Sequence, residues 1–259
     1  MSMRIVVKIG TSTLAYPTGH LNIRRVELLC KVISDIKNAG HEVIIVSSGA
    51  IGMGVGKLGL RQRPTDIPAK QAAAAVGQCE LMYTYDQLFS AYHHIVAQLL
   101  ITGEDVENET RHQNFSNTLN HLLSLKAIPI INENDTVATK EIVIGDNDTL
   151  AAIVAQSIGA DKLILLSDID GLYTADPHLH PDAKLIQTAH CVDDALLNLA
   201  GTSAGTQGTG GMITKLEAAK ICLSCDCDMI ITNGNNPASL YDIVDGKSVG
   251  TTFTVKSYE

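Results

Sequence analysis

The sequence predicts an α/β fold built on a parallel sheet that is covered by helices on both faces. Apolar strand-like segments alternate with segments of helical periodicity through most of the chain, and this alternation is typical of parallel sheets. Several strand segments are almost continuously apolar, such as Lys162-Leu-Ile-Leu-Leu166, as expected for strands buried on both faces. No internal repeat, low-complexity linker or charge run divides the chain. We therefore expect one continuous domain over residues 1–259.

The first elements are the clearest. Residues 4–9 form an apolar strand that ends at Gly10. Residues 23–38 carry apolar side chains at helical spacing, with Asn22 as the N-cap and Gly40 as the stop. The apolar runs along the chain place strands at 4–9, 42–47, 94–100, 127–132, 162–166 and 228–232. Helical patterns, including an Ala-rich one, place helices at 23–38, 69–90, 112–125, 148–158 and 192–200, and one that starts at Gly211.

Composition excludes several classes of function. The chain has 19 Lys and Arg against 28 Asp and Glu, a net charge of −9, with no basic stripe. Nucleic acid and anionic membranes are therefore not expected partners. There is no signal peptide and no apolar stretch of about 18 residues, so we expect no membrane span and a cytoplasmic protein.

The six cysteines are expected to be free thiols in a reducing compartment. The cluster Cys222-Leu-Ser-Cys225-Asp-Cys227 resembles part of a zinc site. No second Cys/His pair with suitable spacing follows it, and structural zinc usually needs four ligands. Partly buried free thiols are the favoured interpretation.

Polar and glycine-rich residues gather where the expected strands end, which is where open α/β sheets bind ligands. The five strand ends are Lys8-Ile-Gly-Thr-Ser12, Ser47-Ser-Gly-Ala50, Asn132-Glu-Asn-Asp135, Ser167-Asp168 and Thr232-Asn-Gly234. Lys8 stands out because burying a lysine in an apolar strand is costly without an anionic partner. It is either a strand-end lysine whose ammonium group reaches solvent or a phosphate ligand, with Gly10 admitting the anion to backbone N–H groups.

Two further segments point to ligand binding. Gly208-Thr-Gly-Gly-Met-Ile-Thr-Lys215 places glycines before a helix, so it is either a flexible loop or an anion site with Lys215 one turn into the helix. Its spacing does not match a P-loop. Gly145-Asp-Asn-Asp148 opens a helix, where one residue would serve as the N-cap. Together with Asn132-Glu-Asn-Asp135 it could hold an ammonium group or a magnesium ion.

One motif is misleading. Gly54-Val-Gly-Lys-Leu-Gly59 matches the GxGxxG pattern of dinucleotide-binding folds. That pattern must follow its strand directly and be followed by an acidic residue about 20 positions later, at the end of the next strand. Here the preceding strand ends near Ser47. A dinucleotide-dependent oxidoreductase is therefore disfavoured.

Taken together, the motifs resemble those of the amino acid kinase family, over essentially the whole chain. They are Val7-Lys-Ile-Gly-Thr-Ser12, Ser47-Ser-Gly-Ala-Ile51, Ile131-Asn-Glu-Asn-Asp135, Val143-Ile-Gly-Asp-Asn-Asp148, Gly171-Leu-Tyr-Thr-Ala-Asp-Pro177 and Gly208–Lys215. Asn-Glu-Asn-Asp followed by Gly-Asp-Asn-Asp resembles the glutamate 5-kinase branch rather than the acetylglutamate, aspartate, carbamate or uridylate kinases. The resemblance implies a three-layer α/β/α sandwich with a mostly parallel central sheet.

The resemblance also implies a reaction and its partners. ATP phosphorylates the side-chain carboxylate of L-glutamate to L-glutamyl 5-phosphate, the first step of proline biosynthesis, and proline is a feedback inhibitor. The other expectations are Mg²⁺ with unassigned protein ligands, a homodimer or homotetramer, and a kinase domain without the C-terminal PUA domain found in many relatives. Two alternatives remain: another amino acid kinase with a different acyl acceptor, and a non-catalytic amino-acid-sensing module.

The resemblance assigns site residues position by position. The catalytic residues would be Lys8, Lys215 and Asp168, with Asp168 holding both lysines in place. The nucleotide-binding residues would be Lys8, Gly10, Ser167, Asp168, Thr209, Gly210, Gly211, Met212, Ile213, Thr214 and Lys215. The glutamate-binding residues would be Ser48, Gly49, Asp135, Asp146, Asn147 and Asp148. Family members usually carry Thr at position 167, and Ser167 keeps the hydroxyl group.

Overall fold

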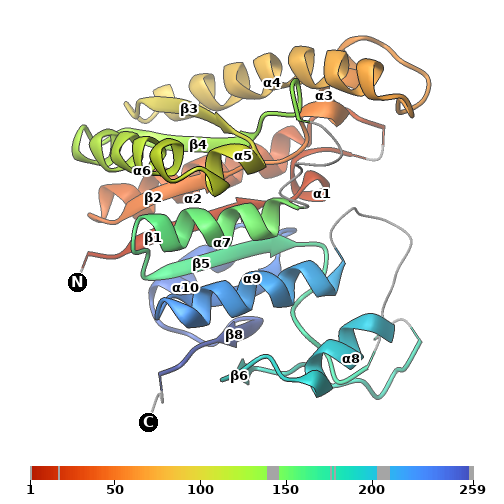
Figure 1. Cartoon of the computed structure of the whole chain (residues 1–259), viewed down its shortest axis with the longest axis vertical. Helices are drawn as coiled ribbons and strands as arrows, with labels where there is room; N and C mark the ends of the chain where they lie inside the picture. The colour runs from red at the N-terminus through yellow and green to blue at the C-terminus, as the bar shows by residue number, and fades with distance from the viewer. Residues whose placement is uncertain are drawn as a thin grey trace.

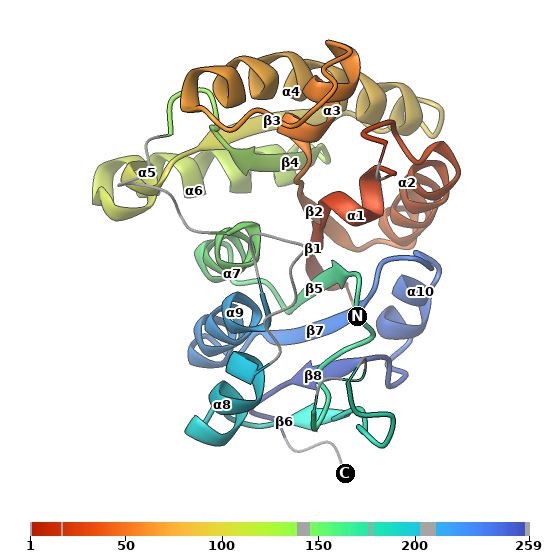
Figure 2. The same ribbon diagram turned by 90° about the vertical axis from the view of Figure 1, so that its right-hand side faces the viewer.

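A single eight-stranded sheet crosses the molecule and separates two layers of helices (Figures 1 and 2). The computed structural model describes residues 2–16, 18–138, 146–175, 177, 179–202 and 211–256. The strands are β1 (Arg4–Ile9), β2 (Glu42–Val46), β3 (Val96–Ile101), β4 (Ile128–Glu133), β5 (Lys162–Ser167), β6 (Thr188–Ala189), β7 (Asp228–Asn233) and β8 (Thr251–Phe253). The helices are α1 (Thr11–Leu14), α2 (Ile23–Asn38), α3 (Ala50–Lys57), α4 (Ile67–Ser90), α5 (Gly103–Glu107), α6 (Glu109–Ser124), α7 (Asn147–Ser157), α8 (Asp194–Thr202), α9 (Met212–Ser224) and α10 (Ser239–Val244).

The sheet order is β3-β4-β2-β1-β5-β7-β8-β6, and neighbouring strands run parallel except β7 and β8, which are antiparallel. This confirms the prediction of a mostly parallel sheet covered on both faces. Strand β1 lies near the centre, with Lys8 in register with Val46 of β2 and Leu165 of β5. The carboxyl ends of these strands therefore lie at one edge of the sheet.

The two faces of the sheet have separate apolar cores. One core packs beneath α6, α7 and α9, and the other beneath α2, α4 and α10 (Figure 2). Side chains alternate between them along β1: Val6 belongs to the first core, while Ile5 and Val7 belong to the second. Because side chains alternate along a strand, Lys8 points to the same face as Val6. The central lysine is thereby directed toward α7 and α9.

The predicted elements are present, with bounds shifted by a few residues. Asn22 caps α2 by accepting a hydrogen bond from the backbone N–H of Arg25 at 3.3 Å. Gly40 follows the helix with φ of +100°, a conformation that favours glycine. The elements that were not predicted are short: α1, α3, α5, α10, β6 and β8. Such short segments lack the repeated periodicity on which sequence prediction depends.

The glycine-rich segment after β2 is helical, and its glycines let two helices approach each other closely. Helix α3 packs against α4 so that a methyl group on Gly54 would lie 1.8 Å from the carbonyl oxygen of Ala73. A methyl group on Gly77 of α4 would likewise lie 1.8 Å from the carbonyl oxygen of Ala50. The GxGxxG pattern therefore serves helix packing, in which only hydrogen fits between the two backbones. Among the residues described, no helix is long and apolar enough to cross a membrane.

We expect Gly54→Ala to destabilise the protein by about 1–3 kcal/mol, because overpacking forces the two backbones apart. Gly52→Ala, on the same helix, is the matched control, since its nearest neighbour would be a methyl carbon of Thr11 at 3.9 Å. Alanine is the better helix former, so the control should be neutral or stabilising. Urea unfolding measures both variants. Equal stabilities of the two variants would contradict the close packing of α3 on α4.

Candidate active site

The carboxyl edge of the sheet gathers residues from β1, β2, β4 and the N-terminus of α7. Lys8 ends the apolar run of β1 and is buried, with 8% of its surface exposed. Gly10 follows it, and its N–H donates to the carbonyl oxygen of Leu166 at 3.3 Å, which ties the β1 end to β5. A buried ammonium group at this position needs an anion close by.

Asp148 provides that anion for two lysines. Its Oδ1 lies 2.7 Å from Nζ of Lys8, and its Oδ2 lies 3.0 Å from Nζ of Lys215. All three side chains are buried. Burial by itself would raise the pKa of Asp148, but the charges and hydrogen bonds of the two lysines hold this pKa below its ordinary value of 3.8. A carboxylate whose ionised form is favoured by its neighbours therefore bridges two cations from different elements.

This geometry corrects the role expected of Asp168. The carboxylate that bridges both lysines belongs to Asp148, which we had expected among the glutamate-binding residues. Asp168 instead follows β5 in an exposed position, and its Oδ1 accepts a hydrogen bond from Oγ of Ser167 at 3.2 Å. The sequence did not distinguish them because Asp168 follows an expected strand end and Asp148 opens an expected helix, and both are positions where ligands bind. Only the packing of α7 over β1 shows which one meets the lysines.

The start of α9 lies against the start of α7. Lys215 is on the first turn of α9, which begins after Gly211. Oγ1 of Thr214 lies 2.8 Å from Oδ2 of Asp146 and 3.3 Å from Oδ2 of Asp148. The free N–H groups of a helix N-terminus and the nearby lysines make this an anion-binding environment. Met212 and Ile213 share this first turn, whereas Thr209 and Gly210 lie outside the described residues.

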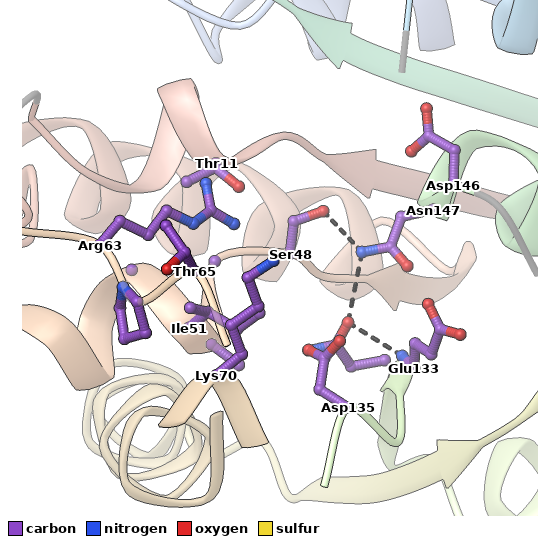
Figure 3. Close-up of a pocket in the computed structure, with 15 residues that line it drawn as sticks. Thr11, Ser48, Ile51, Arg63, Thr65, Lys70, Glu133, Asp135, Asp146 and Asn147 are labelled. Atoms are coloured by element: carbon purple, nitrogen blue, oxygen red, sulfur yellow. Dashed lines mark hydrogen bonds between the residues drawn. The ribbon is translucent and has the colours of Figure 1, made fainter. Parts of the chain in front are cut away.

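A cavity of about 610 Å³ opens on the other side of the α7 N-terminus. Five predicted glutamate-binding residues line it: Ser48, Gly49, Asp135, Asp146 and Asn147. Asn147 lines the cavity while the next residue, Asp148, holds the lysines, so the cavity and the lysine pair adjoin. The lining is completed by Thr11, Ala50, Ile51, Gly52, Arg63, Pro64, Thr65, Lys70, Asn132 and Glu133 (Figure 3 labels most of these residues).

Arg63 and Lys70 were missed by the sequence analysis. They come from the segment that leads into α4 and from its first turn, and Figure 3 shows Arg63 extending along the cavity toward Ser48. Neither residue forms one of the ion pairs found among the described residues. The only sign of these two residues in the sequence was that positively charged side chains lie between a glycine-rich and an alanine-rich segment. Nothing there indicated that this segment folds over the strand ends.

The opposite part of the cavity is acidic. Burial raises the pKa of Asp135, and the positive charge of Arg63 acts in the opposite direction. A buried carboxylate that is only partly compensated favours a cationic ligand. The cavity therefore offers positive and negative groups to the same ligand, as a zwitterionic amino acid requires.

Asn147 is held by several hydrogen bonds that cross the cavity floor (Figure 3). Its Nδ2 lies 2.9 Å from the carbonyl oxygen of Ser47, 2.8 Å from Oγ of Ser48 and 3.3 Å from Oδ1 of Asn132. Since the amide has two N–H groups, two of these three acceptors share one of them. These bonds join α7, β2 and β4. They use the amide nitrogen, and within the described part of the chain no hydrogen bond to Oδ1 of Asn147 is found.

The cysteine cluster was the other candidate for a metal site. The six cysteines are free, and Cys222 and Cys227 are buried while Cys225 is partly exposed. Among the described residues, no group of three or more His, Cys, Asp and Glu is arranged to hold a metal ion.

The family's sequence model matches residues 3–233 and is described as the amino acid kinase family. This chain belongs to the amino acid kinase family. A glutamate 5-kinase from Clostridium perfringens (strain 13 / Type A) is 50% identical over 262 residues, which cover 100% of this chain and 97% of that protein. A glutamate 5-kinase from Listeria innocua serovar 6a (strain ATCC BAA-680 / CLIP 11262) is 48% identical, with 100% and 95% covered.

Solved structures of two other kinases share the fold. The carbamate kinase of Giardia lamblia aligns with a TM-score of 0.68 at 16% identity, covering 98% of this chain and 99% of that one. The UMP kinase of Ureaplasma parvum aligns with a TM-score of 0.66 at 16% identity, with the same coverage. At such low identity these structures establish the architecture alone. They confirm the predicted α/β/α sandwich.

We expect Asp148→Asn to destabilise the protein by about 3–5 kcal/mol at neutral pH, because it leaves two buried lysines without their anion. Asp242→Asn is the control, since its ion pair with Lys247 has the same 2.7 Å distance as that of Lys8 but is exposed. An exposed pair contributes at most about 1 kcal/mol. Urea unfolding at a series of pH values measures both.

The pH dependence of this loss follows from the lowered pKa of Asp148. A carboxylate with a lowered folded-state pKa contributes its stability above the unfolded pKa of about 4 and loses it as the pH falls through the folded pKa. The difference between wild type and Asp148→Asn should therefore be constant from about pH 8 to 5 and shrink below about pH 4. A difference that shrinks between pH 8 and 5 would contradict an ionised Asp148.

Proposed function

We propose that this chain transfers the γ-phosphoryl group of ATP to the side-chain carboxylate of L-glutamate, giving L-glutamyl 5-phosphate and ADP. The observation that carries the proposal is the buried Lys8–Asp148–Lys215 bridge, which adjoins a cavity with charges of both signs. The bridge suits a transferring phosphoryl group and the cavity suits a zwitterionic acceptor. Relatives about 50% identical over nearly the whole chain are named glutamate 5-kinases, which supports the same substrate pair.

The chemistry needs positioning and charge stabilisation rather than a general base. The acceptor carboxylate is already ionised near neutral pH, because its ordinary pKa is about 4.3. The barrier lies in bringing this anion to a triphosphate and in stabilising the charge on the transferring group. Lys8 and Lys215 supply two ammonium groups for that purpose. Asp148 holds both at one place through its two oxygens, so it is a positioning residue.

The nucleotide would lie over the ends of β1 and β5 and the start of α9. Gly10 lies beside Lys8, and a methyl group at Gly10 would lie 3.9 Å from Nζ of Lys8. The hydroxyl of Ser167 and the carboxylate of Asp168 lie at the end of β5. Gly211 precedes the free N–H groups at the start of α9. Mg²⁺ bound to the triphosphate would neutralise part of its charge. The residues named here bind and orient the phosphates.

The acceptor would lie in the cavity with its α-ammonium group toward Asp135 and Oδ1 of Asn147. Arg63 and the hydroxyl of Ser48 would bind its α-carboxylate. A site that offers hydrogen-bond partners to each charged group rejects analogues that lack one of them, since a buried partner is then left unpaired. This assignment distinguishes L-glutamate from an N-acylated amino acid.

The same proposal predicts a role in the first step of proline biosynthesis in the cytoplasm, inhibition by proline, and a homodimer or homotetramer.

The activity is tested by trapping the acyl phosphate with hydroxylamine, which gives a hydroxamate, in the presence of ATP and Mg²⁺. L-Glutamate, N-acetylglutamate and L-aspartate are compared as acceptors, with and without proline. We expect the hydroxamate and stoichiometric ADP with L-glutamate alone among the three. Product with a different acceptor would indicate another amino acid kinase. Glutamate binding without ADP formation would indicate a sensing module.

We expect Asp135→Ala to raise the glutamate KM by roughly tenfold or more, since a charged hydrogen bond contributes about 1.5–3 kcal/mol. The KM for ATP should change little, because Asp135 lines the acceptor cavity and not the lysine pair. Arg63→Gln should show the same selective increase through the α-carboxylate. Steady-state kinetics with each substrate varied in turn measure both. Equal increases in the two KM values would contradict these roles.

A further inference from the structure

Gln78 of α4 is a buried polar residue that the mechanism above does not use. It is 7% exposed and does not belong to the residues that line the cavity. Its Oε1 accepts a hydrogen bond from Nδ2 of Asn132 at 2.9 Å. Within the described part of the chain, its own Nε2 has no hydrogen-bond partner. Buried polar atoms are usually hydrogen-bonded, so a buried glutamine with an unpaired nitrogen calls for an explanation.

Asn132 connects Gln78 to the cavity. Asn132 is 2% exposed and lines the cavity, and its Oδ1 accepts from the backbone N–H of Glu133 at 3.0 Å and from Nδ2 of Asn147 at 3.3 Å. The hydrogen bonds therefore run from Gln78 through Asn132 to Asn147. They join α4, β4 and α7.

Backbone groups fix the direction of these bonds. The N–H of Glu133 can only donate, so the atom of Asn132 that faces it must be oxygen. The carbonyl of Ser47 can only accept, so the atom of Asn147 that faces it must be nitrogen. The Nδ2 of Asn132 is then directed toward α4, where it needs an acceptor. Gln78 supplies this acceptor, and no alternative orientation of the two asparagines satisfies the backbone groups.

We infer that Gln78 is a positioning residue for the acceptor amino acid, acting through Asn132. By accepting from Nδ2, it keeps the nitrogen of Asn132 away from the cavity and its oxygen on the side of Asn147. Oδ1 of Asn132 in turn accepts from Nδ2 of Asn147, so Asn147 and Asp135 are the residues that offer oxygen atoms to the ligand. An ammonium group has three donors and no acceptor, so it is the ligand that these oxygen atoms select.

The inference rests on the proposed acceptor and predicts a specific defect. Without an acceptor at position 78, the buried Nδ2 of Asn132 loses its partner, and the Asn132 amide is held only through its oxygen. We expect Gln78→Met to raise the glutamate KM roughly 3- to 10-fold, the range of one neutral hydrogen bond. The values of kcat and of the KM for ATP should stay within about twofold, because the lysine bridge is untouched.

Glutarate separates positioning from general damage, because it is glutamate without the ammonium group. It is measured as a competitive inhibitor against glutamate. We expect the glutarate inhibition constant of Gln78→Met to stay within about twofold of wild type while the glutamate KM rises. Gln78→Glu keeps an oxygen for Nδ2 of Asn132 and should restore the glutamate KM. Leu81→Val, a buried change on the same helix, is the control for altered packing and should leave both constants unchanged.

A double-mutant cycle tests whether Gln78 acts through Asn132. If it does, Gln78→Met in an Asn132→Ala background should raise the glutamate KM no further than Asn132→Ala alone. An additive effect would overturn the connection. So would an unchanged glutamate KM in Gln78→Met, or equal losses for glutamate and glutarate. Gln78→Leu repeats the test if the methionine variant does not fold.

Glutamate binding measured by calorimetry distinguishes this inference from the proposed function. If the wild-type protein binds glutamate but yields no hydroxamate, the proposed reaction is wrong, and weaker binding to Gln78→Met still supports the positioning role. If wild type is active and Gln78→Met binds glutamate normally, only the positioning role is wrong. If wild type does not bind glutamate, both are overturned.

Discussion

The site depends on one electrostatic constraint: two buried lysines share the carboxylate of Asp148. Lysine is strongly disfavoured in an apolar interior without a counter-charge, and here two of them reach the same place from β1 and α9. The arrangement requires α7 to begin directly above the end of β1, so that Asp148 falls between them. The mostly parallel sheet provides this, because its strands bring their carboxyl ends, and the helices that follow, to one edge. The desolvation free energy of these buried charges is offset only when Lys8, Lys215 and Asp148 are all present.

The same short segment divides the site into two halves. Asn147 and Asp148 are consecutive, yet the first lines the acceptor cavity and the second holds the lysines. A change in the start of α7 would therefore alter acceptor binding and phosphoryl transfer together. The close approach of α3 to α4 supports the other side of the cavity. Glycines at the contact let α3 and α4 pack closely, and Gln78 on α4 accepts a hydrogen bond from Asn132 of β4.

The sequence alone was sufficient for the class of fold and for the strand-end segments of the site, but not for the segment that carries Arg63 and Lys70. Strands such as β1 and β5 were predictable because burial on both faces demands continuous apolar runs. The ends of α2 were predictable because Asn22 and Gly40 satisfy local backbone requirements. The glycines after β2 did not reveal helix α3, since close packing against α4 outweighs their weak helix propensity. The residue pattern singled out Lys8 and Lys215, but the resemblance to known kinases assigned the bridging acid to Asp168.

What the sequence determined by itself is therefore local: which stretches are apolar, where they stop, and which charged and amide side chains follow them. Only the tertiary structure decided which acid bridges the lysines, that Arg63 and Lys70 reach the acceptor cavity, and that Gln78 contacts Asn132. Each of these depends on residues far apart in the chain, such as Lys8, Asp148 and Lys215, meeting through sheet order and helix packing. Charge interactions and hydrogen bonds act over a few ångströms in space. Sequence spacing carries no direct measure of that distance.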